Sequence, residues 1–170
     1  MEYVIIGVVV SFALMVLNRS GSKQVEPLKD GSFELRVHPL YNIVSILGML
    51  MGIIFIIGGI YFRDENLFIM AIFGLIFFLI GIWGFLFYKR YRLKFNENHV
   101  SATDFLGKTK SIQWEEITNI RFNKWLGYLY VLNENEKLTI HQHTVGLKQF
   151  LTMMEQKTEW NVQDLRIPIN

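Results

Sequence analysis

The sequence contains no cysteine, only three prolines, and almost equal numbers of positive and negative side chains. Without cysteine the chain has no disulfide, no thiolate metal site and no cysteine nucleophile. A formal net charge of +2, from 17 Lys and Arg against 15 Asp and Glu, is too small to indicate nucleic-acid binding. We therefore expect no nucleic acid among the partners of this protein.

Charge is also missing from two long apolar runs, Ile43–Phe62 and Leu67–Tyr88. Each run is long enough to cross a ~30 Å hydrocarbon core as a helix. Only residues 63–66 separate the two runs, which leaves room for a tight turn. The sequence therefore predicts a transmembrane hairpin over residues 40–88.

A third apolar run, Tyr3–Leu17, opens the chain and is broken only by Ser11. No Lys or Arg precedes this run and no Ala-x-Ala cleavage site follows it, so a signal peptide is disfavoured. Although the run is short for a span, we expect residues 1–18 to be a retained N-terminal transmembrane helix. Cleavage, or a helix lying in the membrane interface, is the alternative.

The distribution of cations predicts the orientation of these spans. Residues 19–39 are a linker that carries four Lys and Arg, and four more cations follow the hairpin at Lys89, Arg90, Arg92 and Lys94. Lys and Arg are retained on the cytoplasmic side of a membrane. We expect a multi-pass protein of the cell (plasma) membrane, with its N-terminus outside and its C-terminal domain in the cytoplasm.

Small residues within the hairpin predict close helix packing. Gly48 and Gly52 form a GxxxG motif, and Gly74 and Gly81 offer similar surfaces on the second run. The hairpin packing on itself and a homo-oligomeric contact both fit this pattern. The three apolar runs contain no Asp, Glu, Lys, Arg or His, although transporters and proton relays usually place such groups inside the membrane. Transport is therefore disfavoured.

The remainder of the chain alternates apolar and polar residues as short strands do. We expect strands at residues 93–95, 99–105, 109–114, 117–122, 127–132 and 137–141, and a further strand of the same sheet at 33–37. The period then changes, and Val145, Leu147, Phe150, Leu151 and Met154 form a helical stripe that ends near Lys157. The predicted fold is membrane α plus β, with a small β-sandwich or barrel capped by a C-terminal helix. Residues 158–170 are left as a tail, either an edge strand or loose.

Four stretches carry a resemblance to a known family. They are Glu34–Pro39 before the hairpin, Tyr91–Phe95 after it, Trp114–Ile117 with Ile120, and Gly146–Phe150. In these stretches the chain resembles bacterial pleckstrin-homology-like (PH domain-containing) small membrane proteins. The resemblance implies a PH-type barrel closed by a C-terminal helix, over residues 89–157 and strand 33–37, held beside a membrane hairpin.

Residues with catalytic chemistry do not form a recognisable site. His141 and His143 lie on one face of a predicted strand, but no third metal ligand of suitable type is evident nearby. Glu115 and Glu116 are adjacent, so in a strand they face opposite ways and do not form an acid/base pair. Nucleotide-binding and serine-nucleophile motifs are also missing. We expect no enzyme, no catalytic residues, no metal and no cofactor.

Two binding hypotheses follow. In the first, the domain binds a protein partner or a second copy, with Lys124, Trp125 and Tyr128 as contact candidates; Trp125 as a core-capping aromatic is the alternative. In the second, Lys89, Arg90, Arg92 and Lys94 bind anionic membrane lipids, although topology alone also demands such cations. The sequence thus predicts a non-enzymatic, membrane-anchored protein-interaction or assembly module. Its alternatives are a lipid-headgroup module or a small accessory or immunity-type membrane protein.

Overall fold

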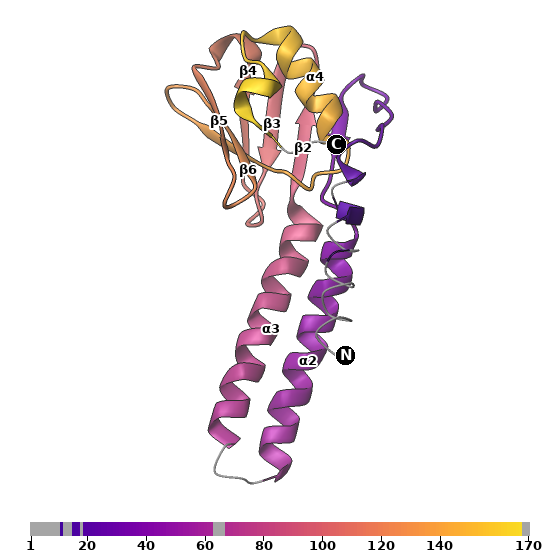
Figure 1. Ribbon diagram of the computed structural model, residues 1–170, viewed down its shortest axis with the longest axis vertical. Helices are drawn as coiled ribbons and strands as arrows, with labels where there is room; N and C mark the ends of the chain where they lie inside the picture. Colours follow the sequence, from indigo (N-terminus) through magenta and orange to yellow (C-terminus); the bar gives the residue numbers. More distant parts are fainter. Residues whose placement is uncertain (1–10, 12–14, 18, 63–66, 168–170) are drawn as a thin grey trace. The chain divides into compact units, whose positions relative to one another are not determined.

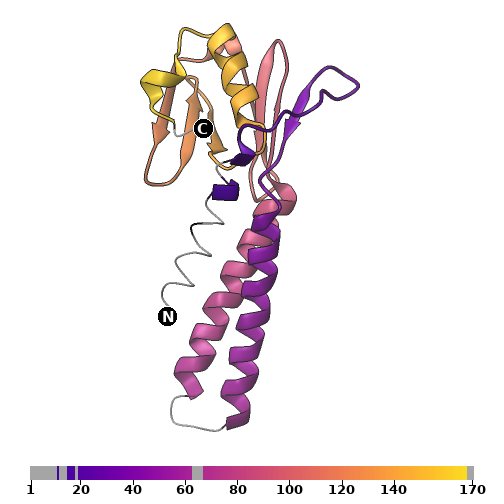
Figure 2. The ribbon, with the colours of Figure 1, turned by 45° about the vertical axis from the view of Figure 1, so that its right-hand side comes forward.

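The computed structural model describes residues 11, 15–17, 19–62 and 67–167, and the chain divides into two compact units (Figures 1 and 2). Unit 2 is the segment Pro39–Arg90. Unit 1 combines the chain before it, up to His38, with the chain after it, from Tyr91 onward. The apolar hairpin is therefore an insertion within one compact unit.

Unit 2 consists of two helices, α2 (Leu40–Phe62) and α3 (Leu67–Arg90). Both are long and apolar enough to cross a membrane. Their apolar side chains are largely exposed, for example Ile54 at 65% and Ile60 at 66%. The third span, predicted at residues 1–18, lies almost entirely outside the described residues and stays a prediction.

The four glycines named from the sequence lie where α2 and α3 approach each other. A Cβ on Gly52 would stand 2.6 Å from the carbonyl oxygen of Gly74, and one on Gly81 would stand 2.7 Å from the backbone nitrogen of Met49. Gly48 is less tight, with the carbonyl oxygen of Phe77 at 3.6 Å. These glycines are thus occupied by packing within the hairpin.

Unit 1 is built from two antiparallel sheets. The first has the order β1-β2-β3-β4 and the second β5-β6-β7. The strands are β1 (Phe33–Leu35), β2 (Arg92–Phe95), β3 (His99–Thr103), β4 (Thr109–Gln113), β5 (Asn119–Asn123), β6 (Tyr128–Leu132) and β7 (Lys137–His141). Helix α4 (Leu147–Lys157) and the short helix α5 (Val162–Leu165) follow β7. The fold class is α plus β.

Strand β1 joins the chain before the hairpin to the chain after it. It pairs antiparallel with β2, with Phe33 opposite Phe95 and Leu35 opposite Leu93. Leu35 and Leu93 are fully buried, and the Phe33 and Phe95 rings stack with centroids 5.2 Å apart. The core therefore requires both flanks of the insertion.

Helix α4 closes the core with its apolar stripe. Phe150 is fully buried, and its ring centroid lies 5.4 Å from that of Phe95 and 5.7 Å from that of Trp114. The chain after α4 also belongs to this core, because Ile167 is only 8% exposed and α5 packs against it. Residues 158–167 thus form neither an edge strand nor a loose tail.

Two local predictions were wrong. His143 was placed on the same strand as His141, whereas β7 ends at His141 and His143 lies in the turn that follows. The sequence predicted a strand through Trp114, whereas β4 ends at Gln113 and Trp114 begins the 3-10 helix η1 (Trp114–Glu116). The turn buries the indole while its Nε1–H donates to the carbonyl oxygen of Asn96 at 2.9 Å. A buried indole N–H needs such an acceptor. Glu115 and Glu116 consequently lie in a helical turn and not in a strand.

Candidate functional site

A buried polar cluster surrounds Tyr91, the residue at which the chain returns to unit 1. The hydroxyl oxygen of Tyr91 accepts a hydrogen bond from the backbone N–H of His141 at 3.0 Å. Tyr91 is only 3% exposed, and burial raises the pKa of its hydroxyl to about 12. The hydroxyl is therefore neutral and has a structural partner.

The histidines of this cluster are also held in the neutral state. Burial, with a smaller contribution from His143, lowers the pKa of His141 to about 4. The backbone N–H of His143 donates to Nδ1 of His141 at 3.1 Å, and the Tyr128 ring packs edge-on against His141 at 5.1 Å. Within the described part of the chain, no group of three or more His, Asp or Glu is arranged to hold a metal ion.

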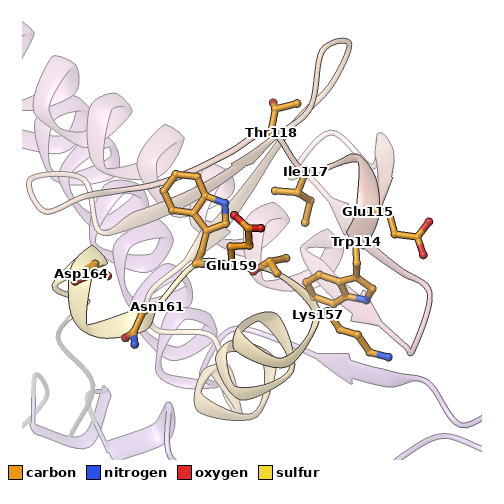
Figure 3. Close-up of a pocket in the computed structure, with 10 residues that line it drawn as sticks. Trp114, Glu115, Ile117, Thr118, Lys157, Glu159, Asn161 and Asp164 are labelled. Atoms are coloured by element: carbon orange, nitrogen blue, oxygen red, sulfur yellow. Dashed lines mark hydrogen bonds between the residues drawn. The ribbon is translucent and has the colours of Figure 1, made fainter.

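A pocket of about 620 Å³ opens beside η1 and α5 (Figure 3). Its lining includes the three carboxylates of Glu115, Glu159 and Asp164. Figure 3 shows Glu115 and Asp164 on opposite sides of the pocket, so these two carboxylates do not face one reacting atom as an acid/base pair would.

Three cations gather around the carboxylate of Glu34 on the face of β1 and β2. Arg36 Nη2 lies 2.7 Å from Oε1, Arg92 Nε lies 3.3 Å from Oε1, and Lys94 Nζ lies 3.2 Å from Oε2. Partial burial opposes ionisation of Glu34, but the hydrogen bonds from Arg36 and Lys94 outweigh it and lower the pKa of the carboxyl. We call these four residues the Glu34 cluster; it carries two positive charges that Glu34 does not balance.

The four lipid-headgroup candidates therefore separate into two pairs. Arg92 and Lys94 belong to β2 and the Glu34 cluster, whereas Lys89 and Arg90 end α3 in unit 2. Lys89 Nζ lies 5.7 Å from the centroid of the Phe85 ring in its own helix. Arg36 was not among the sequence candidates, because only the pairing of β1 with β2 brings it to this face.

The three partner-contact candidates, Lys124, Trp125 and Tyr128, differ in their exposure. Trp125 is 98% exposed in the turn between β5 and β6, which excludes a core-capping position for it. Lys124 lies in the same turn and is exposed, whereas Tyr128 is half-buried against His141. The turn is ordered by Asn123, whose Oδ1 accepts from the backbone N–H of Trp125 at 3.0 Å and of Leu126 at 3.1 Å.

Beside this turn the structure shows a surface that sequence reasoning missed. A depression of about 590 Å³ is lined by Arg121, Phe122, Asn123, Lys124, Trp125, Tyr130 and Lys137. Lys137 Nζ lies 3.8 Å from the centroid of the Tyr130 ring, and the guanidinium carbon of Arg121 lies 5.6 Å from it. We call Arg121, Tyr130 and Lys137 the basic–aromatic groove.

The groove arises from cross-strand pairing. Arg121 on β5 is directly opposite Tyr130 on β6, and Lys137 on β7 is opposite Leu132, two positions further along β6. Side chains at such direct and diagonal positions are within reach of each other. The alternation of the three strands was visible in the sequence, but the register that brings these residues together was not.

No family model, curated protein or solved structure that was compared with the chain matches it. The function proposed below therefore rests on the geometry of the molecule alone.

Proposed function

We propose that this protein is a non-enzymatic interaction module with a PH-like fold, attached to the cell membrane by α2 and α3. The length and apolar surface of both helices support membrane attachment. The cations on both flanks of the hairpin support a cytoplasmic location for unit 1. Two antiparallel sheets followed by a core-closing helix support the PH-like assignment.

The basic–aromatic groove is the proposed docking site, and its ligand is an acidic segment of a protein partner. The observation that carries this proposal is the lining of the depression, which contains three cations and no carboxylate. Arg and Tyr contribute strongly to protein interfaces because each combines a large contact area with polar groups. Charge complementarity of this kind selects acidic partners and speeds their association.

Photo-crosslinking of the full chain in its own membrane tests this proposal. Tyr130 is replaced by p-benzoylphenylalanine, with the exposed Gln156 of α4 as the control position. We expect position 130 to yield a protein adduct whose crosslinked peptide is acidic, and position 156 to yield none. Adducts only with lipid, or the same adducts at both positions, would refute the proposal.

A matched pair of charge variants completes the test. Arg121→Ser with Lys137→Ser removes two charges from the groove, and Lys29→Ser with Lys148→Ser removes two exposed charges elsewhere. The first pair should abolish the adduct and the second should retain it. If both pairs weaken it equally, net charge explains the association and the groove does not.

A second candidate function, binding of anionic lipid headgroups, is favoured by the Glu34 cluster. The Arg36 and Lys94 side chains of this cluster are about half exposed, and each cation near an anionic surface contributes about 1 kcal/mol. Neutral substitutions at Lys89, Arg90, Arg92 and Lys94 should lower the amount of anionic lipid that is retained with the purified protein. Unchanged retention would remove this candidate.

A further inference from the structure

The two ends of unit 1 differ in the apolar and charged residues of their turns. One of these ends contains the two points where the chain joins unit 2. Val37 precedes this junction and forms a β-bridge with Thr144. Tyr91 follows it and accepts a hydrogen bond from the backbone N–H of His141. Both junctions therefore lie beside residues 141–144, at one end of unit 1, which we call the junction end.

Two hairpin turns lie at the junction end. Arg92, at the start of β2, is paired with Thr103, so the β3–β4 turn at residues 104–108 begins there. Tyr128 is paired with His141, and the β5–β6 turn at residues 124–127 precedes it directly. Within unit 1, Figure 1 shows the start of β2 and the β5–β6 turn at the same end. Both turns thus project from the part of unit 1 that adjoins the apolar helices in the chain.

The two turns share an unusual composition. Each places two apolar residues side by side, next to a glycine and with a lysine in the same turn: Phe105-Leu106-Gly107-Lys108 and Lys124-Trp125-Leu126-Gly127. Trp125 is 98% exposed, Leu126 58% and Leu106 56%. Large apolar side chains are seldom presented to water in this way at two turns of one unit, and exposed apolar patches mark interaction sites.

The apolar residues are held outward by ordered backbone. Oδ1 of Asp104 accepts from the backbone N–H groups of Leu106 and Lys108, each at 2.9 Å. Asn123 fixes the other turn in the same manner. Gly107 and Gly127 have φ values of +86° and +66°, which glycine adopts without strain. The exposure of Trp125, Leu126 and Leu106 is therefore built into the fold.

The connections at the opposite end of unit 1 have the reverse character. They are residues 96–98, 114–118 and 133–136, and they contain Glu97, Glu115, Glu116, Glu134 and Glu136 but no Lys or Arg. The pairing of Phe95 with Val100 and of His99 with Gln113 places the first two at the far end of the first sheet, and the pairing of Leu132 with Lys137 places the third at the end of the second sheet away from the β5–β6 turn. Glu97 pairs with Lys157 and Glu136 with Lys110, but Glu115, Glu116 and Glu134 add negative charge that an anionic surface would repel, while it would attract the lysines of the junction end.

We propose that the β3–β4 and β5–β6 turns rest on a phospholipid bilayer, with Trp125, Leu126 and Leu106 in the headgroup region and Lys124 and Lys108 at the phosphates. Trp is the side chain that membrane interfaces favour, because its ring is apolar while its N–H stays hydrated. Lysine adds attraction to anionic lipid and extends its charge toward water. Lys124 and Trp125 also line the depression that holds Arg121, Tyr130 and Lys137, but Leu106, Lys108 and Leu126 do not, so the contact can be tested apart from the proposed function.

Depth-dependent quenching in reconstituted bilayers tests this contact. Because the chain has no native cysteine, the variants Leu126→Cys, Leu106→Cys and Asn135→Cys each carry one fluorescent NBD label. The full chain is placed in protein-free lipid vesicles that contain phosphatidylglycerol and phosphatidylcholine spin-labelled near the headgroup. We expect several-fold stronger quenching at positions 126 and 106 than at position 135, which lies in the β6–β7 turn.

A substitution of Trp125 distinguishes direct contact of the turns with lipid from a position merely close to the bilayer. Trp125→Ser should reduce quenching of the label at position 106 by at least half, because the largest interfacial anchor of the contact is lost, and Lys148→Ser should not. Equal quenching at the two ends of unit 1 would overturn the proposal. Quenching at position 126 that is absent from protein-free vesicles and appears only when other membrane proteins are added would overturn it as well, and would assign this turn to a protein partner.

Discussion

Units 1 and 2 distribute their apolar residues in opposite ways. Unit 1 covers them, so that Leu93 and Phe150 are fully buried. Unit 2 presents them to its surroundings, so that Ile54 is 65% and Ile60 66% exposed. Exposure on this scale in water opposes folding, whereas in lipid it has little cost. Unit 1 thus covers its apolar side chains, whereas unit 2 leaves many of its own exposed, as helices that cross a membrane do.

The two units also differ in what holds their elements together. Unit 1 depends on a core shared by residues that are far apart in the sequence, such as Leu35, Leu93 and Phe150. Unit 2 depends on a few close backbone approaches, since both helices are apolar around their whole circumference. Removing side-chain volume destabilises a packed core, whereas adding side-chain volume disrupts a close approach of two backbones. Each unit should therefore be sensitive to a different kind of substitution.

The largest effect is expected in the core of unit 1. Phe150→Ala removes the ring that contacts Phe95 and Trp114 and should lower the free energy of unfolding of unit 1 by about 3–5 kcal/mol. Urea unfolding of the full chain in detergent, followed by near-UV circular dichroism, measures this loss. The exposed Gln156→Ala in the same helix should change stability by less than about 0.5 kcal/mol. Loss of the α2 and α3 helical signal together with the core would show that the units unfold as one.

Lowering the pH should decrease the stability of unit 1 and leave α2 and α3 unchanged. The pKa of His141 is lowered from 6.5 to about 4, so its stabilising contribution is present above pH 6.5 and is lost as the pH falls toward 4. The difference corresponds to about 3 kcal/mol, because one pKa unit is worth about 1.4 kcal/mol. The pKa of His143 is lowered as well, by burial and then by His38, and adds in the same direction.

Urea midpoints measured between pH 7 and pH 4.5 check this prediction. The midpoint of unit 1 should fall steadily, and His141→Gln should be less stable at pH 7 but show a shallower decline. Helices α2 and α3 contain no Asp, Glu or His, so their helical signal should not change over this range. A decline of equal slope in the variant would mean that other groups control the acid response.

The smallest effect is expected in unit 2, and it comes from added volume. A Cβ on Gly52 would meet the carbonyl oxygen of Gly74 at 2.6 Å, so Gly52→Ala should weaken the α2–α3 contact by about 1–3 kcal/mol. Gly58→Ala is the matched control, because nothing lies within 4 Å of a Cβ there.

Thiol crosslinking measures this contact. The rings of Phe55 and Phe77 lie 6.0 Å apart, so the two side chains face each other, and Phe55→Cys with Phe77→Cys provides a reporter pair for a short bifunctional thiol crosslinker in a chain without other cysteines. Crosslinking should decrease with Gly52→Ala and remain at its original level with Gly58→Ala. Equal crosslinking in both variants would show that the glycines do not set the distance between the helices.

Patterns that repeat over a few residues were readable from the sequence. The apolar runs of α2 and α3 and the period of α4 were evident, since burial on one face or on all faces imposes a local rhythm. Trp114 escaped this reading because a single 3-10 turn has no repeat. The exposure of Trp125 was not predictable either, since the local sequence of a turn does not show whether its tryptophan packs inward or points outward.

The sequence by itself determined which segments are apolar enough to cross a membrane and where strands and the closing helix lie, because these follow from neighbouring residues. Only the tertiary structure decided which distant residues meet. It brought Arg121, Tyr130 and Lys137 together, placed Arg36 beside Arg92 and Lys94, and gathered two apolar turns at one end of unit 1. Each of these arrangements depends on strand register, which the packing of the whole core fixes and no single segment encodes.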